Sequence, residues 1–379
     1  MDQRHGKQNK GRRSRRIPAA AVTLVMAAGA LLFVKRSVDL YRERQVIEAQ
    51  IAANEGNVVQ SIITETVPES QPVSTPFSGS VDWIEEDWRP EVREDVEKDG
   101  RNYELNPNIR TVLILGIDKK GPFESQYIAS NGGQSDAIFL LVQDVTTEEI
   151  RILMIPRDTM TQIRLYDLAG NYVGQGVRHL TLAFAYGTSP AKSCENSANA
   201  VSQLLGGITI NDYLAVTSSA LSTLNDMVGG VTVTINEPGL EERDPALQEG
   251  ATVTLEGDQA EIYLRFRDVN QDNTAISRMD RHRTYMTAWM KQARAAAAAD
   301  DSFGTKLMDS IEDVMVTSMG KDQYLKLGMS VLQSESSLDG TDILMLPGEA
   351  VTGTYYDEYY PDQEAIDDLI LELFYRPAE

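Results

Sequence analysis

The chain has almost no cysteine and far fewer basic than acidic residues. Its 379 residues include one cysteine, Cys194, so no disulfide can form within the chain, and a domain outside the cytoplasm must rely on its apolar core. The net charge is −22, yet residues 1–36 hold nine basic residues and one acidic residue. A main body this acidic excludes nucleic acid as its partner. There is also no internal repeat.

One long apolar run carries no charge. It spans the 18 residues 17–34 and is flanked by RRSRR and by Lys35-Arg36. That length predicts a single membrane span, and the basic flank predicts a cytoplasmic N-terminus. We therefore expect a cytoplasmic tail (1–16), an anchor (17–36) and an extracytoplasmic remainder at the cell membrane. A cleaved signal peptide is the alternative, but a small-residue cleavage site followed by a polar mature start is missing.

Two segments with different compositions follow the anchor, within residues 37–80. Residues 41–64 carry a loose apolar stripe that predicts a stalk helix, through which a second copy of the chain could pair. Pro68, Pro72 and Pro76 then stand among Ser, Thr and Gly, a composition typical of a linker. Residues 81–379 are expected to form the folded domain.

The folded part alternates between apolar runs and helical patterns. We predict strands at 111–117, 137–143, 150–155, 213–217, 231–236, 261–266 and 343–346, and helices at 195–205, 218–228, 277–299, 304–318, 321–333 and 363–375. The first three runs are continuously apolar, as in strands covered on both faces. This alternation predicts an α/β fold, a three-layer α/β/α sandwich.

Charged side chains stand where the expected strands begin and end. Strands that end in charged residues can bring them to one rim of a sheet, where guanidinium groups and carboxylates suit a metal ion and a doubly anionic phosphate. The candidate side chains are Asp118, Asp136, Arg157, Asp158, Arg265, Arg267, Arg278 and Arg281.

The arginines also have simpler explanations. Arg265 and Arg267 are two apart on an expected strand and would share one face, which a bare surface strand would also give. Arg278 and Arg281, three apart at an expected helix start, would share a face and add the helix dipole to their charge. Arg157 follows a buried strand and needs an anionic partner, either phosphate or a neighbouring carboxylate.

Taken in order, these pieces resemble the LytR-CpsA-Psr family of cell-envelope proteins. The matching segments are LILGID, SDAIFLLV, IPRDT, LTLAFAYG, LGG-ITINDYLAV, VGGVTVTI, YLRFRD and SRMDRHR, and the end YYDEYYPDQEAIDDLI also looks like tails of this family. The resemblance covers a family core at 110–297, with 298–379 as a C-terminal extension. It implies a mixed central sheet and an apolar tunnel for a polyprenyl chain.

The resemblance also implies an activity. Such proteins transfer a glycopolymer from a polyprenyl-pyrophosphate carrier to peptidoglycan in Gram-positive envelopes and form a phosphodiester, assisted by Mg²⁺ or Mn²⁺. It assigns the metal to Asp118 and Asp136, which could otherwise be strand-end caps. It assigns catalytic roles to Arg157, Asp158, Arg265 and Arg267, with Asp158 as orienting partner or general base. It assigns the pyrophosphate to Lys120, Arg157, Arg265, Arg267, Arg278 and Arg281.

Several positions depart from the family pattern. Lys120 and Gln134 stand where arginines are usual, His179 replaces part of a lysine-containing triplet, and His282 replaces a common glutamine. The loop 119–134 could close over the phosphates or be a plain surface loop. Two alternatives to transfer stay open: a non-catalytic polyprenyl-lipid-binding or regulatory wall protein, and pyrophosphate hydrolysis as a side activity.

Overall fold

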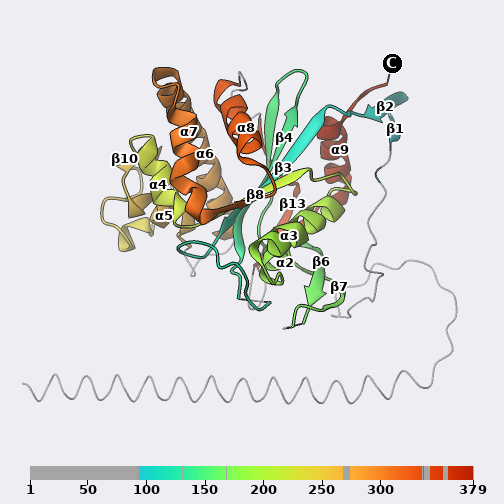
Figure 1. The fold of residues 1–379 in the computed structure, drawn as a ribbon, viewed down its shortest axis with the longest axis horizontal. Helices are drawn as coiled ribbons and strands as arrows, with labels where there is room; N and C mark the ends of the chain where they lie inside the picture. Colours follow the sequence, from blue (N-terminus) through green and yellow to red (C-terminus); the bar gives the residue numbers. More distant parts are fainter. Residues whose placement is uncertain are drawn as a thin grey trace, which may run out of the picture. The chain divides into compact units, whose positions relative to one another are not determined.

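The core of the protein is a six-stranded sheet in the order β11-β8-β3-β4-β5-β12. Figure 1 labels its strands β8, β3 and β4. The computed structural model describes residues 92, 94–129, 131–167, 169–267, 274–334, 336, 342–352 and 357–378. The sheet consists of β11 (Met315–Thr317), β8 (Asp212–Thr217), β3 (Ile109–Ile117), β4 (Ser135–Asp144), β5 (Ile150–Met154) and β12 (Ile343–Met345). β3 runs parallel to β8 and antiparallel to β4, so the sheet is mixed, as predicted.

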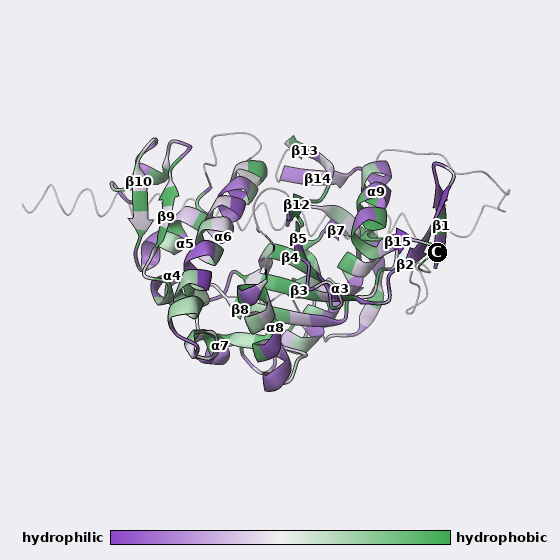
Figure 2. Ribbon diagram, turned by 90° about the horizontal axis from the view of Figure 1, so that it is seen from above, coloured by the Kyte–Doolittle hydropathy of each residue, from purple (hydrophilic) through white to green (hydrophobic). Residues whose placement is uncertain are grey.

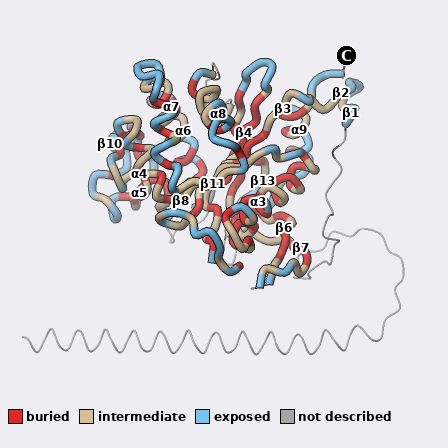
Figure 3. The backbone as a smooth tube through the Cα atoms, in the orientation of Figure 1, coloured by how far each residue is buried: buried red, intermediate tan, exposed pale blue. Residues whose placement is uncertain are grey.

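Alternate residues of the central strands enter two different apolar cores. Leu113 and Leu115 face the core formed with α2 (Thr181–Ala185), α3 (Pro190–Leu204) and α9 (Gln363–Phe374). Val112 and Leu141 face the core formed with α6 (Thr274–Ala299), α7 (Phe303–Ile311) and α8 (Lys321–Gln333). The central strands are therefore apolar along both faces and deeply buried (Figures 2 and 3). The predicted layers of helix, sheet and helix are present.

The smaller sheets surround this core. They are a three-stranded sheet of β1 (Asp95–Lys98), β2 (Arg101–Leu105) and β15 (Tyr375–Pro377), and three pairs: β6 (Met160–Tyr166) with β7 (Tyr172–His179), β9 (Val231–Thr234) with β10 (Thr252–Leu255), and β13 (Gly348–Thr352) with β14 (Asp357–Pro361). A third apolar cluster joins β9 and β10 to α4 (Ala220–Met227) and α5 (Asp258–Arg265). Short 3-10 turns occupy Leu240–Glu242 and Glu312–Val314.

Four predicted elements were wrong in kind or in extent. The helix predicted at 195–205 is α3, which begins earlier, at Pro190. The strand predicted at 261–266 is the helix α5, because Ala260, Tyr263 and Leu264 recur at helical spacing and pack into the third cluster. The helix predicted at 304–318 ends at Ile311, and residues 315–317 pair with β8 as an edge strand. The long helix begins at Thr274 rather than at 277.

The N-terminal predictions fall outside the described residues. These are the tail at 1–16, the anchor at 17–36, and the stalk and linker at 37–80. Among the helices that the structure does describe, none is both long enough and apolar enough to span a membrane. The described residues all belong to one unit within 78–379.

Candidate functional site

Strand pairing brings the first charged residues to one end of the central sheet. Asp118 follows the last residue of β3, and Asp136 is the second residue of β4. Ile117 pairs with Ser135, so these two aspartates are neighbours across the β3–β4 end. β5 runs antiparallel to β4, and Arg157 and Asp158 follow it at the same end. The predicted rim therefore forms.

Ion pairs link these residues to the arginines of the α5 region. Arg157 donates through Nη1 to Asp136 Oδ1, and its Nε lies 3.4 Å from Asp158 Oδ1. Arg265 Nη2 lies 3.8 Å from Asp136 Oδ2, and Arg267 Nη2 lies 3.9 Å from Asp158 Oδ2. The result is one connected network of alternating charge, drawn from segments more than 100 residues apart in the chain.

The route to this geometry differs from the predicted one. Arg265 is the last residue of α5 and Arg267 lies just beyond its end, so the expected shared face of a strand was wrong. The end of α5 nevertheless brings both side chains to the rim. Arg265 approaches Asp136, and Arg267 approaches Asp158.

Arg278 completes the cluster as a buried cation. The residue is 6% exposed, and its Nε has no hydrogen-bond acceptor within the described part of the chain. Burial lowers the pKa of Arg278, while the charge of Asp158 raises it and the charges of Arg267 and Arg265 lower it further. Because α6 begins at Thr274, Arg278 is its fifth residue, just past the first helical turn, and a contribution of the helix dipole stays a prediction.

The buried carboxylate of Asp158 is held in its charged form. Burial by itself would raise the pKa of Asp158, but a hydrogen bond with His179 and the charges of Arg157, Arg278 and Arg267 lower it below its ordinary value. Its Oδ2 has no hydrogen-bond donor among the described residues. Asp158 is therefore an ionised orienting group amid cations and a weak proton acceptor.

Arg157 also retains unused hydrogen-bonding capacity. Burial lowers its pKa, the charges of Asp158 and Asp118 raise it, and those of Arg278 and Arg267 lower it. Its Nε is buried and has no hydrogen-bond acceptor in the part of the chain that the structure describes. Buried donors without acceptors are costly unless a ligand satisfies them, so the cluster has the character of an anion site.

Asp118 joins the cluster through Gln134. Asp118 Oδ1 accepts a hydrogen bond from the Gln134 backbone N–H at 2.7 Å, and the Gln134 side-chain oxygen accepts one from Arg157 Nη2 at 2.6 Å. Gly133, at φ +91°, makes this possible, because a Cβ there would lie 2.8 Å from Asp118 Oδ1. Gln134, noted in the sequence only as a departure, is thus the bridge between two predicted site residues.

The carboxylates at the rim fit a metal ion only together with a phosphate ligand. Among the described residues there is no group of three or more His, Cys, Asp and Glu side chains that could hold a metal. Asp118 and Asp136 supply two carboxylates, and Mg²⁺ commonly takes one or two carboxylates plus substrate phosphate oxygens. Asp136 faces two arginines. If a diphosphate engaged those two arginines, the carboxylate oxygens of Asp136 would be available to a metal ion.

Two predicted pyrophosphate residues have other partners. Arg281 is bound by Glu237 and by the Phe266 carbonyl oxygen, contacts that serve the packing of α6. Lys120 is mostly exposed and lies 3.0 Å from Glu261, which in turn accepts a hydrogen bond from Arg265 at 2.9 Å. Lys120 is therefore at the edge of the network, whereas the contacts of Arg281 lie outside it.

Sequence reasoning did not assign three residues that the structure adds. Asp357, at the start of β14, pairs with Arg267 at 2.6 Å, and Glu261 pairs with Arg265. His179 Nδ1, at the end of β7, lies 3.7 Å from Asp158 Oδ1. The Tyr-rich segment around 357 had been noted only as a family-like tail, and no spacing in the sequence relates it to Arg267.

The loop 119–134 is tied down at several points. The Gly121 backbone N–H donates to Ser219 Oγ at 2.8 Å, and the Tyr127 hydroxyl lies 2.7 Å from Ser193 Oγ. The backbone N–H of Tyr127 also donates to the Thr188 carbonyl oxygen. These contacts favour an ordered loop beside the rim. Closure over a ligand stays a prediction.

The chain is thus an α/β protein with a mixed sheet between helical layers and a cluster of arginines and aspartates at one end of the sheet. The LytR_cpsA_psr family model matches residues 85–373. The chain therefore belongs to the LytR-CpsA-Psr family, as the sequence resemblance predicted.

Known proteins agree with this assignment. The chain is 25% identical over 268 residues to a Bacillus cereus protein named polyisoprenyl-teichoic acid–peptidoglycan teichoic acid transferase TagU, covering 69% of this chain and 77% of that relative. A crystal structure from Streptococcus agalactiae matches with a TM-score of 0.55 at 21% identity, covering 70% of this chain and 87% of the other. Bacillus subtilis TagV matches with a TM-score of 0.52 at 21% identity, covering 71% and 97%. The two structures share the fold of this chain.

Proposed function

We propose that this chain is a membrane-anchored phosphotransferase that moves a glycopolymer from a polyprenyl-pyrophosphate carrier to peptidoglycan. The observation that carries the proposal is the meeting at one rim of Arg157, Arg265, Arg267 and Arg278 with Asp118, Asp136 and Asp158. A diphosphate needs several cationic donors in a confined place, and a lipid-binding protein without catalysis would not need the carboxylates as well. Family membership and the name of the Bacillus cereus relative add support.

The reaction forms one phosphorus–oxygen bond and breaks another. A sugar hydroxyl oxygen of the acceptor attacks the phosphorus that bears the glycan, and the bond from that phosphorus to the bridging oxygen breaks. Polyprenyl phosphate leaves with the electron pair, and the hydroxyl proton passes to a base. Negative charge grows on the leaving phosphate and the equatorial oxygens, so placement and charge stabilisation carry most of the catalysis.

The side chains divide this work. The four arginines hold the phosphate oxygens: Arg157, Arg265, Arg267 and Arg278. Asp158 keeps Arg157 and Arg267 oriented through its ion pairs. Asp118 and Asp136 would hold Mg²⁺ or Mn²⁺, which supplies neutralisation of phosphate charge. The lowered pKa of Asp158 makes it a positioning group rather than the base.

A transfer assay with the purified full-length chain tests the proposal. The reaction would contain a short-chain pyrophosphate-linked glycan donor, a peptidoglycan glycan acceptor and Mg²⁺. Wild type should form the phosphodiester product, and Arg267→Ala should lose about 100-fold or more in rate. Arg283→Ala is the matched control, because Arg283 is half-exposed and paired with Asp280. No turnover in wild type, or full turnover in Arg267→Ala, would overturn the proposal, while release of glycan phosphate without acceptor would reveal the pyrophosphatase side activity.

The anchored, extracytoplasmic location is part of the same proposal. It rests on the charge-free residues 17–34 and their basic flanks. Protease digestion of intact cells should remove the domain beyond residue 80, and digestion that needs lysed cells would contradict the topology. Mass spectrometry of lipid that co-purifies with the detergent-extracted chain would identify the polymer.

A further inference from the structure

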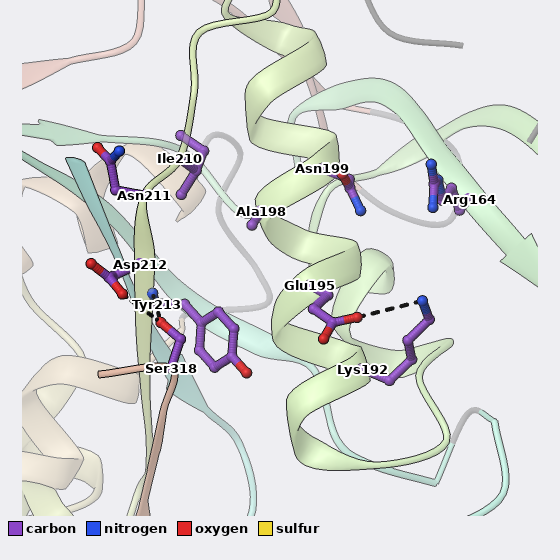
Figure 4. Close-up of a pocket in the computed structure, with 10 residues that line it drawn as sticks. All are labelled: Arg164, Lys192, Glu195, Ala198, Asn199, Ile210, Asn211, Asp212, Tyr213 and Ser318. Atoms are coloured by element: carbon purple, nitrogen blue, oxygen red, sulfur yellow. Dashed lines mark hydrogen bonds and ion pairs between the residues drawn. The ribbon is translucent and has the colours of Figure 1, made fainter. Parts of the chain in front are cut away.

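A pocket lies beside α3, and none of its lining residues belongs to the charged rim. It has a volume of about 320 Å³ and lies where α3 faces β8 and the residues beside it (Figure 4). Small-molecule sites usually occupy roughly 300–1,000 Å³, so this pocket suits a short ligand. Asp212 pairs with Val112 at the beginning of β8, whereas Ile117 pairs with Thr217 at the rim. Asp212 at the pocket therefore lies five strand residues, or roughly 17 Å along β8, from Thr217 at the rim.

The charges that line the pocket cancel. Lys192 Nζ lies 3.5 Å from Glu195 Oε2, the pair drawn as a dashed line in Figure 4. Asp212 pairs with Arg110 at 2.8 Å, and the remaining charged lining residue is Arg164. Two acidic and two basic side chains thus surround the space. A site of this balance has no preference for a polyanion, in contrast to the arginine cluster at the rim.

The uncharged lining combines an aromatic ring with unused hydrogen-bonding groups. The Tyr213 ring lies between β8 and α3, and its hydroxyl makes no hydrogen bond within the residues that the structure describes. The Asn199 amide likewise has no hydrogen-bond partner among the described residues. The side-chain oxygen of Asn211 accepts hydrogen bonds from Thr111, whereas its NH₂ group makes none there. Burial raises the pKa of Tyr213 to about 12, which keeps the hydroxyl protonated. Ala198 and Ile210 add apolar surface.

This set of groups matches one class of ligand. A sugar ring has an apolar C–H face that packs on an aromatic ring, and hydroxyl and acetamido groups at its edge that pair with amides and phenols. We propose that this pocket is a saccharide-binding site that holds an uncharged stretch of the N-acetylhexosamine glycan strand, with Asp212 roughly 17 Å along β8 from the rim. The proposal rests on the proposed function for the identity of that strand, which would be the acceptor.

Binding measurements on the full-length chain test this inference without turnover. An N-acetylglucosamine tetrasaccharide would be titrated by calorimetry against wild type, Tyr213→Phe, Tyr213→Ala, Asn199→Ala and the control Asn102→Ala. Asn102 is exposed on β2, which is paired with β1 and β15. Loss of the Tyr213 ring should weaken binding about tenfold, equivalent to about 1.4 kcal/mol, with a smaller loss in Tyr213→Phe and none in Asn102→Ala.

The outcomes separate this inference from the transferase proposal. If wild type does not bind the tetrasaccharide, or if the Tyr213 and Asn199 variants bind it as tightly as Asn102→Ala, the pocket is not a saccharide site, whatever the transfer assay shows. If the variants lose binding but no form of the chain transfers glycan, the pocket stands and the proposed function fails. A parallel titration with a glycerol phosphate oligomer tests whether the pocket binds an anionic donor polymer instead of the acceptor strand. Tighter, Tyr213-dependent binding of that polyanion would overturn the assignment to an uncharged strand. Tyr213→Phe removes only an oxygen, so it remains informative if Tyr213→Ala fails to fold.

Discussion

Replacing Arg278 by methionine should separate stability from ligand binding. Arg278 is 6% exposed on α6, and its Nε finds no acceptor among the described residues. Methionine has a similar length, favours helix and carries no charge to desolvate. Burial and the like charges of Arg267 and Arg265 disfavour the charged form of Arg278, and Asp158 keeps Arg157 and Arg267 as partners when Arg278 is lost. We therefore expect the free energy of unfolding to stay constant or to rise by about 1 kcal/mol.

The same change should weaken diphosphate binding. A charge-assisted hydrogen bond contributes about 1.5–3 kcal/mol, so the Kd of a short prenyl diphosphate should rise roughly ten- to hundredfold. Urea unfolding followed by fluorescence and calorimetric titration would measure the two properties. Arg283→Met on the same helix is the control, since Arg283 is half-exposed and paired with Asp280. A loss of more than about 2 kcal/mol of stability together with unchanged diphosphate affinity would refute the reasoning, because Arg278 would then be structural.

Three other predictions concern stability. The pKa of Asp158 is lowered from 3.8, so ionised Asp158 stabilises the folded state fully above pH 3.8. This stabilisation is lost as the pH falls through the lower pKa of the folded state. Asp158→Asn should therefore flatten the fall of the unfolding midpoint with pH in that acidic range. Burial lowers the pKa of His282 from 6.5 to about 3, so the unfolded chain binds a proton first and stability falls as pH drops between those values. His282→Gln, which can still donate to Leu264, should reduce that fall in urea titrations, and an unchanged pH profile would argue against a buried neutral imidazole. Asn225, fully buried, bridges three segments by hydrogen bonds, so Asn225→Ala should cost about 3 kcal/mol of unfolding free energy against almost none for Asn102→Ala, and a loss below about 1 kcal/mol would contradict this.

The central fold was predictable because its strands are buried on both faces. Continuous apolar runs such as 111–117 can lie only inside a layered core, and these strands form as expected. The segment at 261–266 was predicted wrongly because a short apolar run fits both periods. Only its packing against the third cluster, through Tyr263 and Leu264, selects the helix.

The site residues that stand at the ends of strands could be predicted from the sequence. Those that reach the site, or leave it, through long-range tertiary contacts could not. Asp118, Asp136 and Arg157 follow from strand pairing. Asp357 reaches Arg267 across 90 residues of sequence, and Arg281 is diverted to Glu237, a contact set by the path of the chain after β9. No local spacing encodes such pairs.

The affinity of the rim for a diphosphate tests the central claim most directly. Full-length wild type and Arg267→Ala would be titrated in Mg²⁺ with the diphosphate, the monophosphate and the alcohol of one short prenyl chain. Wild type should bind the diphosphate most tightly and the alcohol least, and this preference should shrink at least tenfold in Arg267→Ala. Equal affinity for all three ligands, or a preference that survives the loss of Arg267, would contradict a diphosphate site at the end of the sheet.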